Sequence, residues 1–268
     1  MDGDGVDAVD VAGLRIAFQR EGHGPPLVLV HGFVGDGIGT WRHQLDTLSD
    51  AFTVIAWDAP GAGHSSVPPD SFRLPDYADC LAGFVRALDL THPYVAGLSF
   101  GAVMALELFR QHRDIPKKLV LASAYAGWAG SFPADVVAER LRRSLEASRL
   151  PPPEFVAALL PSMFSAGAPA DEVAAFAANI AEFDPAGFRL MAIASAEADL
   201  RDMLPSIDVP TLLLYGDQDV RAPRPVAEAL HAAIPGSRLV FLPGVGHASS
   251  IEAPDPFNAE VRTFLDEP

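Results

Sequence analysis

A series of short apolar runs recurs along the chain, and it limits the possible folds more than any other feature. Each run is rich in Val, Leu and Ile, lacks polar alternation and ends at a glycine-containing or polar loop. Such runs are typical of strands that are covered on both faces. They occupy residues 27–30, 52–57, 94–97, 118–123, 211–216 and 238–244.

Helical patterns lie between or after these runs. Amphipathic periodicity is found in segments 75–90, 101–112, 223–233 and 254–266. Alternating strands and helices predict the α/β class, with a mostly parallel central β-sheet flanked by helices. The earlier segment 12–20 predicts an antiparallel leading strand.

Residues 127–200 interrupt the alternation, because they contain no convincing buried strand. They show four helical patterns instead, each with proline at or near its start. Proline suits the first turn of a helix, where its missing N–H is not needed. We expect an all-helical cap here, inserted into a core domain made of residues 1–126 and 201–268. Ordinary crossover helices are the alternative interpretation.

Composition limits the classes of binding partner that the chain is expected to have. The chain has 19 basic and 35 acidic residues, a net charge of -16. Such a charge repels phosphate backbones and anionic lipid, which favours a small-molecule partner over nucleic acid or membrane. The single cysteine, Cys80, excludes an internal disulfide. Residues 1–10 lack the pattern of a signal peptide, so the sequence predicts a cytoplasmic monomer or homodimer.

Residues 97–101 read GLSFG, the G-x-S-x-G pattern. The pattern follows an apolar run and precedes a helical segment, so it predicts a sharp turn from strand to helix. Such a turn exposes the hydroxyl of Ser99 at the carboxyl edge of the sheet, and flanking glycines leave room for it. The N-terminus of the following helix adds N–H groups and a positive dipole end.

A serine nucleophile needs a base, and that base needs an orienting acid. His247 follows the last apolar run, and both Asp217 and Asp219 follow the run before it. All three side chains are therefore expected at the same sheet edge as Ser99. The chain order serine, aspartate, histidine is that of one large fold family.

Five segments carry a specific resemblance: HGFVG, DAPGAGHS, GLSFGA, VPTLLLYGDQD and GVGH. The chain resembles the α/β-hydrolase fold superfamily over residues 12–126 and 201–266, with a serine hydrolase of esterase or lactonase type implied. The resemblance implies Ser99 as nucleophile, His247 as base and Asp219, preferred to Asp217, as acid.

The resemblance also implies an oxyanion hole made by the backbone N–H groups of Phe33 and Phe100. His31 is expected to shape its turn through local hydrogen bonds. No cofactor is implied, and no cluster of His, Cys and acidic residues has the spacing of metal ligands.

Apolar side chains next to the motifs or in the cap are candidates for the substrate pocket: Trp128, Phe132, Met163, Phe164 and Met191. Such a lining favours a neutral substrate, with Arg221 as the nearest cation. We therefore expect hydrolysis of small to medium, mainly apolar carboxylic esters or lactones through a covalent acyl-enzyme.

Three other functions fit the same residues. One is a carbon–carbon bond hydrolase of ring-cleavage products, although HGFVGDG is a poor match to the HGSGPG type of stretch. Another is a cofactor-free perhydrolase or haloperoxidase. A third is a ligand receptor with slow turnover, which the turnover rate on its ligand would separate from an enzyme.

Overall fold

One eight-stranded sheet organises the molecule, in the order β1-β2-β4-β3-β5-β6-β7-β8. The structure is a computed structural model that describes residues 5–267; of the acidic start, residues 1–4 lie outside the described part. Strands β3 to β8 run parallel, and the pairs β1–β2 and β2–β4 are antiparallel. The strands are β1 (Asp7–Val11), β2 (Leu14–Glu21), β3 (Pro26–Val30), β4 (Thr53–Trp57), β5 (Tyr94–Leu98), β6 (Lys118–Ala122), β7 (Thr211–Gly216) and β8 (Arg238–Leu242).

The six apolar runs form β3 to β8, so the predicted α/β class and mostly parallel sheet are confirmed. The segment predicted at 12–20 is an antiparallel strand, as expected, but it is the second strand of a hairpin and not the leading one. Ala12 and Gly13 have positive φ values of 52° and 85° and connect β1 to β2. In β1 only Val11 is buried, so this strand lacks the apolar run that marks the others.

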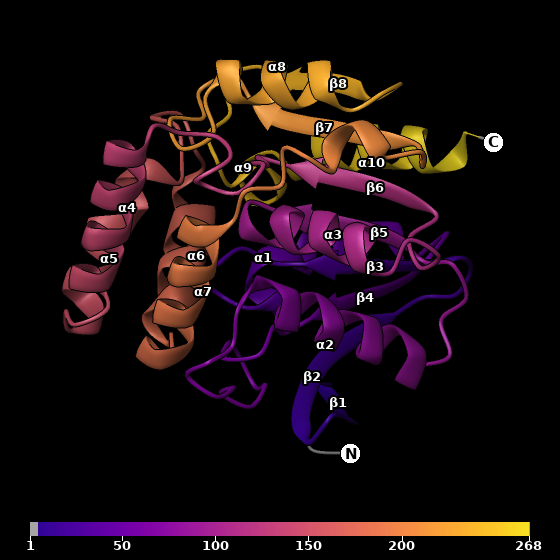
Figure 1. Cartoon of the computed structure of the whole chain (residues 1–268), viewed down its shortest axis with the longest axis horizontal. Helices are drawn as coiled ribbons and strands as arrows, with labels where there is room; N and C mark the ends of the chain where they lie inside the picture. The colour runs from indigo at the N-terminus through magenta and orange to yellow at the C-terminus, as the bar shows by residue number, and fades with distance from the viewer. Residues whose placement is uncertain (1–4, 268) are drawn as a thin grey trace.

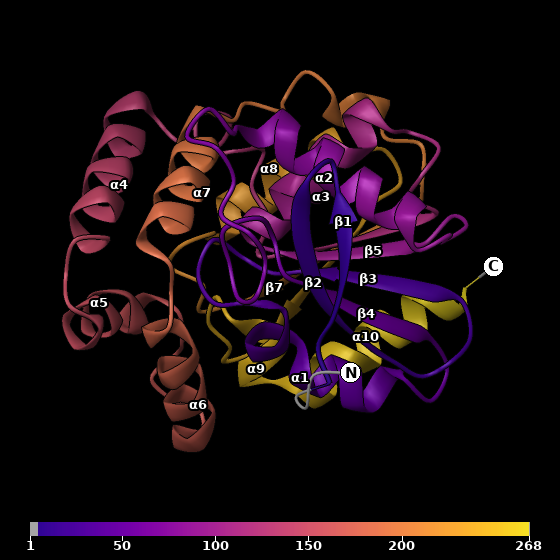
Figure 2. The ribbon, with the colours of Figure 1, turned by 90° about the horizontal axis from the view of Figure 1, so that it is seen from below.

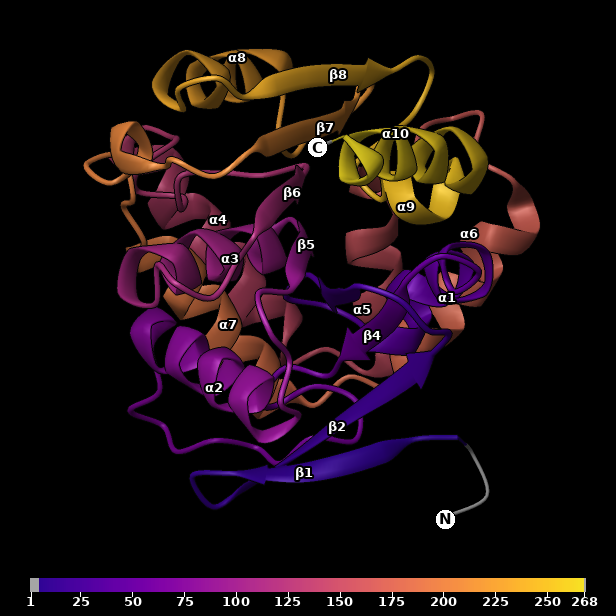
Figure 3. The same cartoon turned by 90° about the vertical axis from the view of Figure 1, so that its right-hand side faces the viewer.

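Helices cover both faces of the sheet, as Figure 3 shows. Helices α2 and α3 lie on one face, and α1 and α10 lie on the other. No helix within residues 5–267 is long and apolar enough to cross a membrane. The helices of the core are α1 (Gly37–Leu48), α2 (Leu74–Ala87), α3 (Phe100–Gln111), α8 (Arg224–Ala233), α9 (Ser249–Glu252) and α10 (Pro254–Asp266).

Helix α1 was not predicted from the sequence. It begins after Asp36, whose Oδ1 accepts a hydrogen bond from the N–H of Gly39 at 2.7 Å. This N-cap stabilises a helix that starts with glycine, a poor helix former. The apolar face of α1 includes Trp41, whose ring lies 6.1 Å from that of Phe257 in α10.

Residues between β6 and β7 form a helical insertion: α4 (Ala134–Ala147), α5 (Pro152–Leu159), α6 (Ala170–Ala181) and α7 (Pro185–Glu197). Figures 1 and 2 show these helices beside the core, past the ends of the strands. Proline occupies the first turn of α5 and α7 and the N-cap of α4 and α6.

Polar contacts hold the insertion against the core. The Asn179 side chain donates to Asp36 Oδ2 at 2.7 Å, and Glu172 pairs with Arg42. Ser165 Oγ, in the loop before α6, donates to Glu252 at 2.5 Å. These contacts place the insertion over the carboxyl edge of the sheet, where the sequence motifs gather.

Candidate active site

Ser99 lies at the turn between β5 and α3. Its φ of 57° and ψ of -115° are values that a non-glycine residue rarely adopts, so the turn is strained. A Cβ on Gly97 would lie 2.3 Å from the carbonyl oxygen of Gly101, and one on Gly101 would lie 2.0 Å from that of Val30. Glycines on both sides therefore allow the tight packing that fixes Ser99 at the start of α3.

His247 and Asp219 meet at the same edge of the sheet. The Nδ1 atom of His247 lies 2.9 Å from Oδ2 and 3.0 Å from Oδ1 of Asp219. The carboxylate also accepts from the N–H groups of Arg221 (2.8 Å) and Ala222 (2.9 Å). Both side chains are buried, and Ser123 Oγ donates to the His247 carbonyl at 2.9 Å. The pair is thus held by its backbone as well as by its mutual hydrogen bond.

Burial and the mutual contact set the charges of this pair. Burial lowers the pKa of His247 below its usual 6.5, although Asp219 opposes that shift. Burial acts to raise the pKa of Asp219, but His247 and the backbone N–H groups outweigh it and lower this pKa. At neutral pH the imidazole is therefore neutral and the carboxylate ionised. With Nδ1–H bound to Asp219, Nε2 is the nitrogen that can accept a proton.

Ser99 and His247 line one small cavity of about 10 Å³. A volume of ~10–15 Å³ admits a single water molecule, so the site is closed to larger molecules in this conformation. Met163 and Phe176 of the insertion line it from one side. The complete lining is Gly32, Phe33, Val34, Thr40, Leu98, Ser99, Met163, Phe176 and His247.

The two N–H groups expected in the oxyanion hole belong to Phe33, which lines this cavity, and to Phe100, which follows Ser99 at the start of α3. No acceptor within residues 5–267 is hydrogen-bonded to the N–H of Phe33 or to that of Phe100. The loop that carries Phe33 approaches Ser99 closely, because a Cβ on Gly32 would lie 3.6 Å from that of Ser99. Free N–H groups beside a serine hydroxyl are suited to hold a developing negative charge.

Asp217 and His31 have other partners. Asp217 Oδ1 accepts from the N–H of Gly244 at 2.7 Å, so this carboxylate closes a turn and Asp219 is the one that contacts His247. Both ring nitrogens of His31 bond to backbone groups nearby.

The five apolar residues expected to line one substrate pocket do not lie together in the structure. Met163 lines the cavity with Ser99, Trp128 lines a pocket of about 490 Å³ beside α4, and Met191 lines another of about 320 Å³. Phe132 packs under the guanidinium of Arg140, 3.9 Å from its Cζ. The ring of Phe164 packs edge-on against Phe176 at 5.4 Å.

Thr40 and Phe176 line the cavity without having been identified from the sequence. Thr40 lies in α1 and Phe176 in α6, the one a helix that was not predicted and the other part of the insertion. Neither belongs to a motif. Their placement depends on how α1 and α6 pack, and no local sequence signal marks it.

Comparison with known proteins identifies the family. Residues 25–254 match the family model described as the alpha/beta hydrolase fold. The chain therefore belongs to the α/β hydrolase fold family, which confirms the resemblance found in its motifs.

Three relatives are informative. The pimeloyl-(acyl-carrier protein) methyl ester esterase of Vibrio vulnificus is 30% identical, over 92% of this chain and 96% of that protein. A thermophilic esterase from Thermogutta terrifontis, solved with malate bound, has a TM-score of 0.89 at 29% identity, covering 97% of this chain and 98% of that one. The enol-lactonase from Burkholderia xenovorans has a TM-score of 0.87 at 26% identity, covering 97% and 100%. The chain is thus an α/β hydrolase whose relatives include esterases and a lactonase.

Proposed function

We propose that this protein is a serine hydrolase of carboxylic esters or lactones. The observation that carries the proposal is the buried Asp219–His247 pair, which shares one cavity with the hydroxyl of Ser99. The esterase and lactonase relatives support the same class of reaction.

The reaction starts when His247 Nε2 takes the proton of Ser99 Oγ as the oxygen attacks the substrate carbonyl carbon. The N–H groups of Phe33 and Phe100 stabilise the oxyanion that forms. His247 then gives its proton to the leaving alkoxide, and an acyl-serine ester remains. Water, deprotonated by His247, hydrolyses this ester and regenerates Ser99.

Residues 127–200 act in this proposal as a cap that must open. The cavity at Ser99 admits about one water, and the insertion forms one of its walls. Movement of α4 to α7 away from the core would admit a substrate, and their return would exclude bulk water. Hydrogen exchange should therefore be faster in these helices than in β3 to β7. Equal protection of both regions would argue against an opening cap.

Neutral p-nitrophenyl esters of graded acyl length test the reaction. We expect an initial burst of p-nitrophenol, a preferred chain length, and labelling of Ser99 by a fluorophosphonate. Ser99→Ala should abolish the burst and the label and lower kcat by at least about 10⁴-fold. Undiminished hydrolysis in Ser99→Ala would refute the proposal. Lactones assayed in parallel decide which of the two bonds is preferred.

A further inference from the structure

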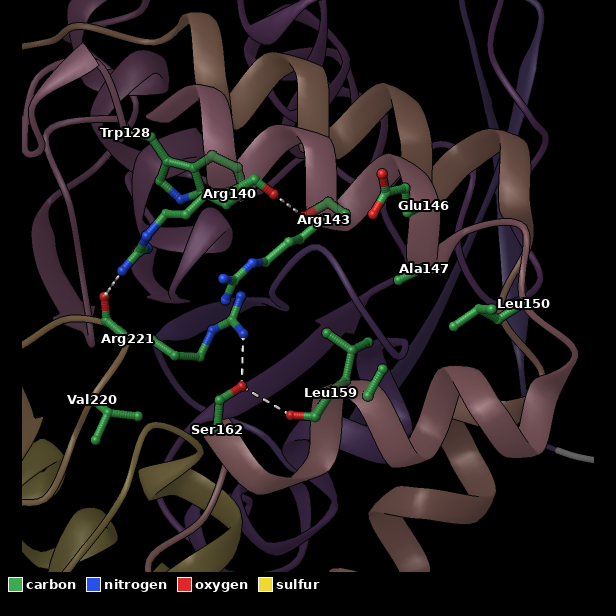
Figure 4. Close-up of a pocket in the computed structure, with 12 residues that line it drawn as sticks. Trp128, Arg140, Arg143, Glu146, Ala147, Leu150, Leu159, Ser162, Val220 and Arg221 are labelled. Carbon is green, nitrogen blue, oxygen red and sulfur yellow. Dashed lines mark hydrogen bonds between the residues drawn. The ribbon is translucent and has the colours of Figure 1, made fainter. Parts of the chain in front are cut away.

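A pocket of about 490 Å³ lies between α4, α5 and the loop that follows β7. Three arginines line it, namely Arg140, Arg143 and Arg221. Figure 4 shows the guanidinium groups of Arg143 and Arg221 pointing toward one another. The acidic side chain in the lining, Glu146, is bound at 2.6 Å and 2.7 Å by Arg142. Arg143 Nε donates to Glu139 at 2.5 Å, so Arg140 and Arg221 are the lining arginines that no carboxylate binds within the described chain.

This excess of positive charge is unusual for such an acidic chain. With 35 acidic against 19 basic residues, carboxylates are available to pair with most arginines. The two deepest guanidiniums nevertheless bond to neutral oxygens within residues 5–267. Arg140 donates to the carbonyl of Arg221 at 2.8 Å, and Arg221 donates to Ser162 Oγ at 2.9 Å. Guanidinium groups that no carboxylate binds, here those of Arg140 and Arg221, are suited to bind an anion from outside.

Arg221 has a donor that nothing uses. Its Nε is enclosed and has no hydrogen-bond partner within the described chain, although the side chain as a whole is only partly buried. The ionised carboxylate of Asp219 offsets part of the Arg221 charge, but its hydrogen bonds go to His247 and to backbone N–H groups. Arginine remains protonated at neutral pH, so an enclosed charged donor without a partner is costly and an entering anion would relieve that cost.

One aromatic layer separates this pocket from the cavity at Ser99. The Cζ of Arg221 lies 5.4 Å from the ring centroid of Phe33, a residue that also lines the cavity. The ring of Trp128, in the pocket wall, lies 6.0 Å from the Phe33 ring. A substrate with its carbonyl at Ser99 could therefore extend past Phe33 to the arginines when the cap opens.

We propose that this pocket binds an anionic group, carboxylate or phosphate, at the far end of the substrate whose carbonyl lies at Ser99. Arg221 and Arg143 contact the anion. Arg140, stacked on Phe132 with its Cζ 3.9 Å from the ring centroid, is a positioning residue that holds the carbonyl of Arg221. The inference rests on the proposed hydrolase function, and it assigns a substrate that is apolar near the carbonyl and charged at its distal end.

Matched pairs of p-nitrophenyl esters test the inference. One member is the monoester of a dicarboxylic acid of six to eight carbons, and the other is the ester of the monocarboxylic acid with the same number of carbons. The quantity measured is the ratio of kcat/KM for the charged ester to that for the neutral ester. We expect Arg221→Gln to lower this ratio about 10- to 100-fold, the size expected for a lost hydrogen bond to a charged group.

Three variants control the result. Arg143→Gln removes an exposed side chain that also donates to Glu139, and it should lower the ratio to a smaller extent. Arg221→Lys keeps the charge without the planar fork and should fall between wild type and Arg221→Gln. Arg149→Gln removes the same charge from an exposed position outside the pocket lining and should leave the ratio unchanged. A ratio that Arg221→Gln and Arg143→Gln both leave within about 2-fold of wild type overturns the inference.

Calorimetry distinguishes a carboxylate ligand from a phosphate ligand, and it tests the anion site independently of the proposed hydrolase function. Adipate and inorganic phosphate are titrated into the wild type and into Arg221→Gln. Arg221-dependent binding of adipate assigns a carboxylate, and Arg221-dependent binding of phosphate alone assigns a phosphate group; binding of neither overturns the inference. If the wild type hydrolyses no ester yet binds adipate through Arg221, the proposed function fails while the anion site stands.

Discussion

His247 and His31 are both buried, both follow a parallel strand and both have a pKa lowered by burial. They differ in what their ring nitrogens contact. His247 uses Nδ1 for the carboxylate of Asp219 and keeps Nε2 for the cavity. In His31, Nδ1–H donates to the carbonyl of Gly32 at 2.6 Å and Nε2 accepts from the N–H of Ala59 at 3.0 Å.

A buried histidine is available for proton transfer when one of its ring nitrogens has no protein partner. A ring with both nitrogens bound to the backbone is fixed as one neutral tautomer and has no lone pair for a substrate. A ring oriented by a carboxylate on one side keeps the other nitrogen free, and its protonated form is stabilised by that carboxylate. We therefore expect His31 to serve the fold and His247 to serve the proposed reaction.

Removing His247 should have the largest effect on activity. His247→Ala leaves Ser99 without a base, and we expect kcat on the best p-nitrophenyl ester to fall about 10⁴- to 10⁶-fold. Steady-state kinetics on the purified variant measures the loss, with circular dichroism to show that the fold is intact. A loss below about 10²-fold would mean that another group takes the proton of Ser99.

Asp219→Asn should have the second-largest effect on activity and lower kcat about 10⁴-fold. The amide can donate to Nδ1 of His247, which would place the proton on Nε2 and leave no lone pair facing Ser99. Asp217→Asn is the matched control, because this exposed carboxylate contacts only the turn at Gly244. Equal losses in both variants would contradict the assignment of Asp219.

The sequence predicted the parts of this site that depend on local signals. The turn at Ser99 requires glycine at 97 and 101. Strands β5, β7 and β8 are apolar runs that can be recognised in the sequence. Parallel strands bring their carboxyl ends together, so the positions of Asp219 and His247 followed. The pocket lining could not be predicted in the same way. It depends on how α4 to α7 pack on the core. No sequence pattern indicates that Arg140, in α4, contacts Arg221, in the loop after β7.

His31→Ala should reduce stability far more than it reduces activity. The substitution leaves the carbonyl of Gly32 and the N–H of Ala59 buried without a partner, so the free energy of unfolding should fall by about 2–4 kcal/mol. Urea denaturation at neutral pH measures it. We expect kcat to fall by less than about 10²-fold, since the ring nitrogens of His31 contact backbone groups of Gly32 and Ala59 and not Ser99. A loss as large as that of His247→Ala would remove the distinction between the two histidines.

The smallest effect concerns the pH dependence of stability. Both histidines have a pKa below 6.5 in the folded protein, so below 6.5 the unfolded chain binds more protons and stability falls as the pH is lowered. Between pH 7.5 and 6.0, linkage with an unfolded pKa of ~6.5 gives a loss of at most about 0.8 kcal/mol for each histidine. His31→Ala should remove the contribution of one histidine, so the stability of this variant should depend less on pH than that of the wild type. Urea titrations at the two pH values measure both. An equal dependence in both proteins would show that His31 becomes protonated in the folded state as readily as in the unfolded chain, and that its two backbone hydrogen bonds do not hold it neutral.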